Sequence, residues 1–306
     1  MIAIDFSQIY LAPIFLDGAC KVCAQNPDSY SRDLMLHYAV NSVRSNFVAH
    51  GKKYGNMVIA CDSGSWRRNV FPEYKHKRRQ NRKTDTSGID WNFVHQTGTY
   101  IKQVLRDYFP FAVVEVPGLE ADDIIGILAK LSNSETQETN IFGEPETEPF
   151  LIISSDADHY QLHRYSNVRQ WSPQTKKLVK PDLKPRNALI NKIVRGDTGD
   201  GIPNIRSPGN AFVENIRQKP ISEKYLQTFY SAKNPIDACA SEEERLNYVR
   251  NEQLVSYEFT PTDLVEKAMQ VYLAEKNKTH SKMKLMTFLA ENKLNILYSK
   301  IGDFYQ

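Results

Sequence analysis

The stretch LIISSDADHYQL, from Leu151 to Leu162, decides how the sequence is interpreted. Its three branched apolar residues predict a short buried strand. The strand runs into two serines, and two acids then follow at Asp156 and Asp158. Because such strands usually end in neutral turns, two aspartates at this place need a reason.

Three more apolar runs with acids near their ends predict strands at 1–6 (MIAIDF), 56–62 (NMVIACD) and 111–116 (FAVVEV). Helical patterns lie between them at about 31–53, 91–108 and 118–131. Strands that alternate with helices and are nearly all apolar indicate α/β architecture, with a mainly parallel central sheet flanked by helices. We expect this domain to span 1–190. Amphipathic stretches at 241–257, 261–275 and 281–292 predict a helical region over 191–306.

Composition excludes several classes of protein. Of 306 residues, 25% are charged and 41% hydrophobic, and no stretch approaches the ~20 apolar residues of a membrane span. The first residues, MIAIDFSQIY, lack the features of a signal peptide, so we expect a protein that stays in the cytoplasm of the cell making it. Cys20 and Cys23 form one C-x-x-C pair without a second pair, which favours reduced thiols over a zinc site.

Acidic residues gather where the predicted strands end. In an open parallel sheet, ligands bind beyond the carboxyl ends of the strands, so these acids should share one cleft. A single aspartate there would be a turn or cap residue, but several groups in succession are better explained as ligands of cations. Carboxylates without His or Cys suit Mg²⁺ or Mn²⁺, and two such ions ~4 Å apart cleave phosphodiesters. The candidate ligands are Asp5, Asp62, Glu120, Asp122, Asp123, Asp156, Asp158, Asp197 and Asp200.

A basic block follows the second predicted strand. Eight Lys or Arg residues lie between Arg67 and Lys83, against one acid. Charge runs are usually solvated faces, but aromatic residues interleave this one, a pattern that suits single-stranded nucleic acid. We expect about 66–90 to be mobile until nucleic acid binds, and the acidic stretch 132–149 to be a mobile loop. The candidate nucleic-acid-binding residues are Arg67, Arg68, Tyr74, Lys75, Lys77, Arg78, Arg79, Arg82 and Lys83.

Five motifs in order, IDFSQI, CDSGSWRRNVFPEYK, EADD, ISSDADHYQLHRYSNVRQWSP and GDTGDGIP, resemble the 5′-nuclease superfamily of flap endonucleases, in particular its phage ribonuclease H group. The resemblance implies an α/β nuclease domain with a basic arch and a helical region with a helix-turn-helix-like DNA-binding element. It implies a 5′→3′ exonuclease and flap endonuclease that uses two Mg²⁺, with Mn²⁺ as substitute. The substrates would be branched or flapped DNA and RNA–DNA hybrids, including RNA primers in phage DNA replication.

The resemblance also implies roles for individual residues. Asp158, Asp197 and Asp200 match the second metal region, and Asp123 matches an acid of less defined role. Tyr74 matches an arch residue that contacts the base. Catalytic roles would fall to Lys75, Arg78, Asp122 and Asp156. The first metal region would comprise Asp5, Asp62, Glu120, Asp122 and Asp156.

The resemblance further implies a monomer in the cytoplasm of an infected host cell, with the phage single-strand-binding protein and sliding clamp as partners. One departure is Ala157 between the two acids, where the family has Gly. Another is Ser207, Gly209 and Ala211 in the hairpin over 201–211, where two glycines and a Lys are usual. Two alternatives remain: a PIN-type ribonuclease with a similar acidic pocket, and a DNA-junction-binding protein without catalysis.

Overall fold

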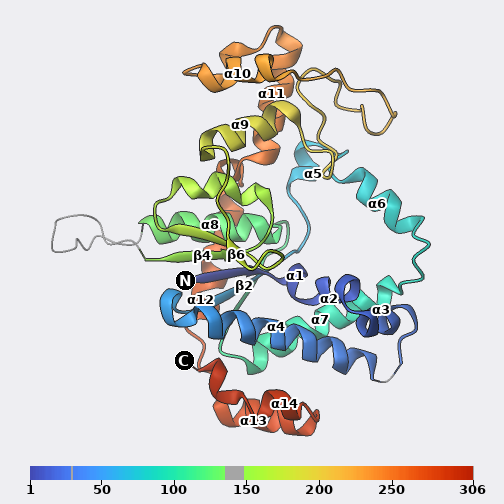
Figure 1. The fold of residues 1–306 in the computed structure, drawn as a ribbon, viewed down its shortest axis with the longest axis vertical. Helices are drawn as coiled ribbons and strands as arrows, with labels where there is room; N and C mark the ends of the chain where they lie inside the picture. The colour runs from blue at the N-terminus through green and yellow to red at the C-terminus, as the bar shows by residue number, and fades with distance from the viewer. Residues whose placement is uncertain (29, 135–147, 306) are drawn as a thin grey trace, which may run out of the picture.

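The computed structural model describes residues 1–28, 30–134 and 148–305, and is built around one six-stranded sheet (Figure 1). The strand order is β3-β2-β1-β4-β5-β6. The first five strands are parallel and β6 is antiparallel to β5, so the predicted mainly parallel sheet is confirmed. The strands are β1 Ile2–Asp5, β2 Met57–Cys61, β3 Ala112–Glu115, β4 Phe150–Ile153, β5 Val168–Ser172 and β6 Lys177–Leu178.

The structure has helices at each of the six stretches that the sequence predicted, which are 31–53, 91–108, 118–131, 241–257, 261–275 and 281–292, and it has others that were not predicted. The chain forms α1 Phe6–Tyr10, α2 Ala12–Leu16, α3 Gly18–Gln25, α4 Ser31–Tyr54, α5 Arg67–Val70, α6 His76–Lys83, α7 Trp91–Tyr108 and α8 Ala121–Ser134. It continues with the 3₁₀ helix η1 Ala157–Arg164, then α9 Pro185–Arg195, α10 Glu223–Ser231, η2 Pro235–Ala238, α11 Glu242–Val255 and η3 Tyr257–Phe259. The last elements are α12 Thr262–Lys276, α13 Lys282–Glu291, α14 Asn295–Tyr298 and η4 Ile301–Phe304. No helix in the described ranges is both long and apolar enough to cross a membrane.

The C-terminal helices complete the cores on both faces of the sheet. On one face, α4 and α7 cover the strands, and Leu285 and Leu289 of α13 join the same apolar cluster. On the other face, α8 covers the strands together with Tyr272 of α12. The boundary expected between residues 190 and 191 falls inside α9. The division of the chain into two domains at this point stays a prediction.

The segment 66–90 is anchored at its start, contrary to the expectation that all of it is mobile. Trp66 packs into the core beside α8, while Phe71 and Tyr74 belong to a third core with α9 to α11. These apolar residues cannot form a core alone, but they join cores built by other elements. Helix α6 departs from this anchor, and Figure 1 shows it at the edge of the molecule, away from the sheet.

Two further expectations concern loops. The helix-turn-helix-like element expected near 201–211 is not formed, because α9 and α10 are joined by turns over 196–222 rather than by a short connection. A helix-turn-helix needs a turn of about three or four residues. The predicted acidic loop, 132–149, lies mostly outside the described residues; its first residues are the end of α8.

Candidate active site

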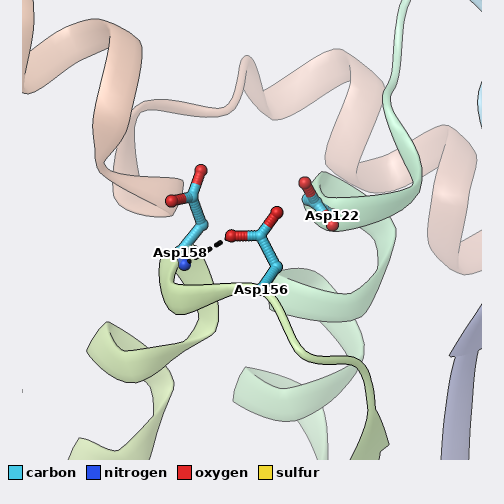
Figure 2. Close-up of side chains that lie close together, drawn as sticks. All are labelled: Asp122, Asp156 and Asp158. Carbon is cyan, nitrogen blue, oxygen red and sulfur yellow. Dashed lines mark hydrogen bonds between the residues drawn. The ribbon is translucent and has the colours of Figure 1, made fainter. Parts of the chain in front are cut away.

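The strand that opened the sequence analysis ends in a turn that fixes two carboxylates. Asp156 has extended backbone angles and caps η1, with its Oδ1 accepting a hydrogen bond from the N–H of Asp158 at 2.9 Å (Figure 2). The N–H of Asp156 donates to Ser154 Oγ at 3.0 Å, and Gln170 donates to the Asp156 carbonyl at 2.7 Å. Hydrogen bonds to the backbone groups of Asp156 and Asp158 thus hold the turn.

Two groups of acids meet at this turn. Asp122, from the first turn of α8, faces Asp156 and Asp158 across the cleft (Figure 2). In this group, and in a second one of Asp158, Asp197 and Asp200, one carboxylate oxygen of each residue lies within 4.8 Å of the others. Five of the predicted acids therefore lie close together, and Asp158 is the residue that the two groups share.

The loop that carries Asp197 and Asp200 depends on a glycine. Gly196 has φ +72°, and a Cβ there would lie 2.3 Å from the carbonyl oxygen of Ile202. The chain can therefore turn sharply enough for Asp197 and Ile202 to pair through their backbones at 2.8 Å. The Asp197 carboxylate then accepts the N–H of Asp200 at 3.1 Å, which fixes both acids at the mouth of the cleft.

Cationic side chains partly balance this negative charge. Lys192 of α9 forms an ion pair with Asp158 and lies 2.8 Å from Asp197. Lys75 pairs with Glu120 and lies 3.7 Å from Asp200, while Arg78 lies 3.1 Å from Asp200. Lys192 was not among the predicted site residues, because a lysine on an amphipathic helix carries no signal unless the turn after that helix is known.

The pKa values of the acids reflect this uneven balance. Burial would raise the pKa of Asp122, but His159 and Lys75 outweigh it and lower the pKa to about 2. Burial also opposes ionisation of Asp197, and Lys192 outweighs it, so that pKa is lowered too. Burial and the neighbouring Asp122 charge instead raise the pKa of Asp156. His159 and Lys192 act in the opposite direction on the pKa of Asp156 but do not outweigh burial and the Asp122 charge.

Three predicted ligands lie beside the two groups rather than in them. Asp5 caps α1 by accepting the N–H of Ser7 at 2.7 Å, and burial together with the charges of Asp122 and Asp62 raises its pKa. Asp62 accepts Ser7 Oγ at 2.8 Å and the N–H of Ala121 at 2.9 Å. Glu120 accepts three hydrogen bonds at 2.9–3.1 Å on one oxygen. Glu120 nevertheless lines the same pocket as Asp122, Asp158 and Asp200.

Asp123 and Arg67 require a correction. Asp123 is fully buried, and both of its oxygens accept hydrogen bonds from Arg67, at 2.8 and 2.9 Å. Arg67 is itself 4% exposed and also donates to the carbonyl of Leu254 at 2.6 Å. Asp123 does not line the cleft, so it does not fit a metal ligand. Arg67 borders the cleft, but it is almost fully buried and hydrogen-bonded to Asp123 and Glu120, so it does not fit a nucleic-acid contact. Asp123 and Arg67 together join α5, α8 and α11.

The other predicted nucleic-acid-binding residues divide by exposure. Tyr74 is buried, and its hydroxyl donates to Glu120 and Asp200, so its ring is not free to stack on a base here. Arg68 and Arg78 are exposed. Lys77 lies over the ring of Phe212, and Arg79 donates to the backbone at Pro72 and Tyr74. The backbone places Arg82 and Lys83 in the last turn of α6, and their side chains lie outside the described atoms.

Behind the acids lies a histidine that the sequence analysis did not use. His159 is fully buried, its Nε2 is 3.3 Å from Asp122, and its Nδ1 is 3.3 Å from the hydroxyl of Tyr257. Tyr257 packs closely enough on Gly126 that a Cβ there would lie 2.9 Å from its ring. His159 therefore orients Asp122 from behind and does not open into the cleft.

The sequence is similar to those of known nucleases. A family model described as a 5′-3′ exonuclease N-terminal, resolvase-like domain matches residues 36–187, and one described as T4 RNase H, C terminal, matches residues 185–304. Ribonuclease H of Enterobacteria phage T4 is 27% identical over 311 residues, which cover 98% of this chain and 94% of that protein. DNA polymerase I of Bacillus subtilis is 26% identical over 58% of this chain and 19% of its own length.

Solved structures share the fold. The T5 D15 protein co-crystallised with metal ions has a TM-score of 0.56 at 15% identity, covering 90% of this chain and 99% of that one. A pseudo-enzyme–product complex of the T5 D15 flap endonuclease with DNA and metal ions has a TM-score of 0.54 at 15% identity, with the same coverage. With the two family models together spanning 36–304 and the full-length similarity to a phage ribonuclease H, the chain belongs to the family of 5′-3′ exonucleases that includes T4 RNase H.

Proposed function

We propose that the protein is a metal-dependent, structure-specific 5′→3′ exonuclease and flap endonuclease that acts on branched DNA and RNA–DNA hybrids. We further propose that it removes RNA primers during phage DNA replication, as its similarity to a phage ribonuclease H suggests. The proposal rests on two clusters of three acids each, which share Asp158 and lie next to the exposed basic helix α6. The acids suit divalent cations, and the helix suits a phosphate backbone.

The residues present fit two hard divalent cations. Every member of the two groups offers carboxylate oxygens, and spacings within 4.8 Å suit ions that lie about 2.0–2.6 Å from each ligand. Mg²⁺ is therefore the proposed ion, with Mn²⁺ as substitute, and the five ligands are Asp122, Asp156, Asp158, Asp197 and Asp200. When bound, such ions supply a hydroxide nucleophile and stabilise the charge that develops on the phosphate.

The chain's own residues position the substrate in this proposal. Lys75 is 20% exposed at the mouth of the cleft and is held in the left-handed region, at φ 57°, by its N–H bond to Asp200 at 2.7 Å. From there its ammonium can exchange Glu120 for a phosphate oxygen, and Arg78 can approach the same phosphate from α6. A fixed cation near the reacting phosphate stabilises the transition state. The single-stranded 5′ arm then passes between α6 and the cleft.

A labelled flap substrate tests the proposal. A 5′-labelled flap should be cleaved with Mg²⁺ and left intact with EDTA. Asp122→Asn and Asp156→Asn should nearly abolish cleavage but keep flap binding in Ca²⁺, since each removes a ligand and not a phosphate contact. Asp263→Asn, an exposed acid in the first turn of α12, is the matched control and should stay active. Near-wild-type turnover by either cleft variant would refute the assignment.

The same assay separates the two alternatives. A PIN-type ribonuclease would cleave single-stranded RNA and would not require a branch. A non-catalytic junction-binding protein would bind the flap with the same affinity in Mg²⁺ and in EDTA, and it would leave the flap intact in Mg²⁺.

A further inference from the structure

The foot of the basic segment carries a row of three aromatic rings. Phe15 of α2 lies 6.5 Å from Trp91 at the start of α7, and Trp91 lies 6.2 Å from His95, measured between ring centroids. Neighbouring rings are tilted by 38° and 35°, so they form a continuous and not a flat surface. Phe15 is 64% exposed, an unusual state for a large apolar ring beside a core.

Trp91 and the chain that precedes it are held in place by three hydrogen bonds. The indole N–H of Trp91 donates to Asp85 at 2.5 Å, and the N–H of Asp90 donates to the carbonyl of Ala24 at 2.7 Å. Gln25 at the end of α3 donates to the Ser87 carbonyl at 2.7 Å. The chain that descends from α6 is thus tied to α3 next to the rings. Pre-positioned rings lose little conformational freedom when they bind.

The row lies at the foot of a strongly basic segment. Helix α6, which carries five Lys or Arg residues and no acid, leads directly into the chain at the foot of the row. Figure 1 shows α6 and this chain descending toward α2, α3 and the start of α7, so that they enclose the side of the molecule on which α1 follows β1. A ligand on this side of the molecule would lie near the basic helix α6 and near the segments that carry the rings. That combination suits single-stranded nucleic acid, whose phosphates pair with cations while its bases stack.

We propose that Phe15, Trp91 and His95 form a stacking platform for bases of the single-stranded 5′ arm. The inference rests on the proposed function and adds positioning residues to it, at the part of the arm beyond the cleaved bond. Every base can stack on an aromatic ring, so the affinity for the 5′ arm should depend on the length of the arm and not on its sequence. Phe15 and Trp91 should therefore matter only when the arm is long enough to reach them.

The test compares two junctions in Ca²⁺ by fluorescence anisotropy. One carries a 5′ flap of about 15 nucleotides, within the range that single-strand sites cover, and the other a single-nucleotide flap. Phe15→Ala and Trp91→Ala should each weaken binding of the long flap about five- to 150-fold, from a stacking loss of about 1–3 kcal/mol per base. Binding of the short flap should stay within about two-fold of wild type.

Conservative variants separate stacking from structural damage. Phe15→Trp and Trp91→Phe keep a ring and should retain long-flap affinity, whereas Phe15→Leu keeps only apolar volume and should not. Tyr30→Ala is the control, because Tyr30 is 63% exposed but lines a different hollow with Asn295 and Ile296. In the wild type, 2-aminopurine placed along the flap should lose fluorescence at the stacked positions, and Phe15→Ala should restore it.

The outcomes are distinguishable from failure of the proposed function. Equal loss on both junctions, or Trp91→Phe as weak as Trp91→Ala, would overturn the platform and indicate a structural role. Wild-type binding that does not depend on flap length would also overturn it, even if cleavage is normal. Failure of the wild-type protein to bind either junction would refute the proposed function, and the platform with it.

Discussion

Replacing Asp123 by Asn should destabilise the protein strongly even without metal. Arg67 and Asp123 are 4% and 0% exposed, and their two N–H···O contacts are 2.8 and 2.9 Å long. An arginine cannot lose its proton in a protein, so the variant leaves a buried guanidinium without its main counter-charge. Breaking such a pair costs about 3–5 kcal/mol. Because Glu120 remains 3.1 Å away as a second partner, we expect about 3 kcal/mol, the lower end of that range.

Urea unfolding in EDTA measures this loss. With a slope of about 3 kcal/mol per molar urea, the midpoint should fall by roughly 1 M. Asp263→Asn is the control, since Asp263 lies in the first turn of α12 as Asp123 lies in that of α8, but is 67% exposed. Replacing both partners with apolar residues of similar size, Arg67→Met with Asp123→Leu, should recover part of the loss.

The opposite result would restore the original assignment of Asp123 as a metal ligand. Removing one acid from a crowded, metal-free cluster would relieve repulsion, so stability in EDTA would stay the same or rise. If Asp123→Asn unfolds at the wild-type urea concentration but loses Mn²⁺ binding, the structural role inferred here is wrong.

The remaining predictions concern the loop at Gly196, the Lys192 ammonium beside the acids, and the basic segment from Arg67 through α6. Gly196→Ala should lower the free energy of unfolding in urea by about 2 kcal/mol or more, because φ is +72° and the new Cβ would clash at 2.3 Å. Gly18→Ala is the control and should be neutral, because Gly18 has open space around it. Equal stability of the two variants would contradict the prediction. Lys192→Met should tighten Mn²⁺ binding measured by calorimetry, because it removes the ammonium that now pairs with Asp158 and Asp197; unchanged or weaker affinity would contradict competition. Limited trypsin digestion should cut after the Lys and Arg residues of α6 and should spare the buried Arg67. Flap DNA should protect the sites in α6. An early cut after Arg67 would contradict the burial of its side chain.

The predictable part of the fold is the part whose sequence signal is local. β1 to β4 are buried on both faces and therefore consist of continuous apolar runs. β5, VRQWS, alternates buried and more exposed positions and buries Gln170, which donates to Ser154 and Asp156, so its apolar signal is weak. Helices α1 to α3 are short and interrupted by Pro13 and Gly18, which leaves no periodicity to detect.

The candidate site was predictable as far as topology determines it. The carboxyl ends of parallel strands meet at one edge, so Asp156 and Asp122 could be placed together from the sequence alone. The sequence could not show which opposite charge each acid pairs with. Asp122 and Asp123 are adjacent on α8, but one faces the cleft and the other faces Arg67 in the interior. Only the rotation of that helix distinguishes a candidate metal ligand from half of a buried ion pair.

The base of the arch and the acidic cleft are one hydrogen-bonded unit. Tyr74 donates to Glu120 and Asp200 at 2.9 Å each, and the N–H of Lys75 donates to the Asp200 carbonyl at 2.7 Å. A cation bound by Asp200 would compete with the tyrosine hydroxyl and with Arg78 for the same oxygens. A phosphate at Lys75 would likewise release Glu120. Metal, substrate and arch therefore act on shared atoms, so we expect binding of one to change the position of the others without any longer-range transmission.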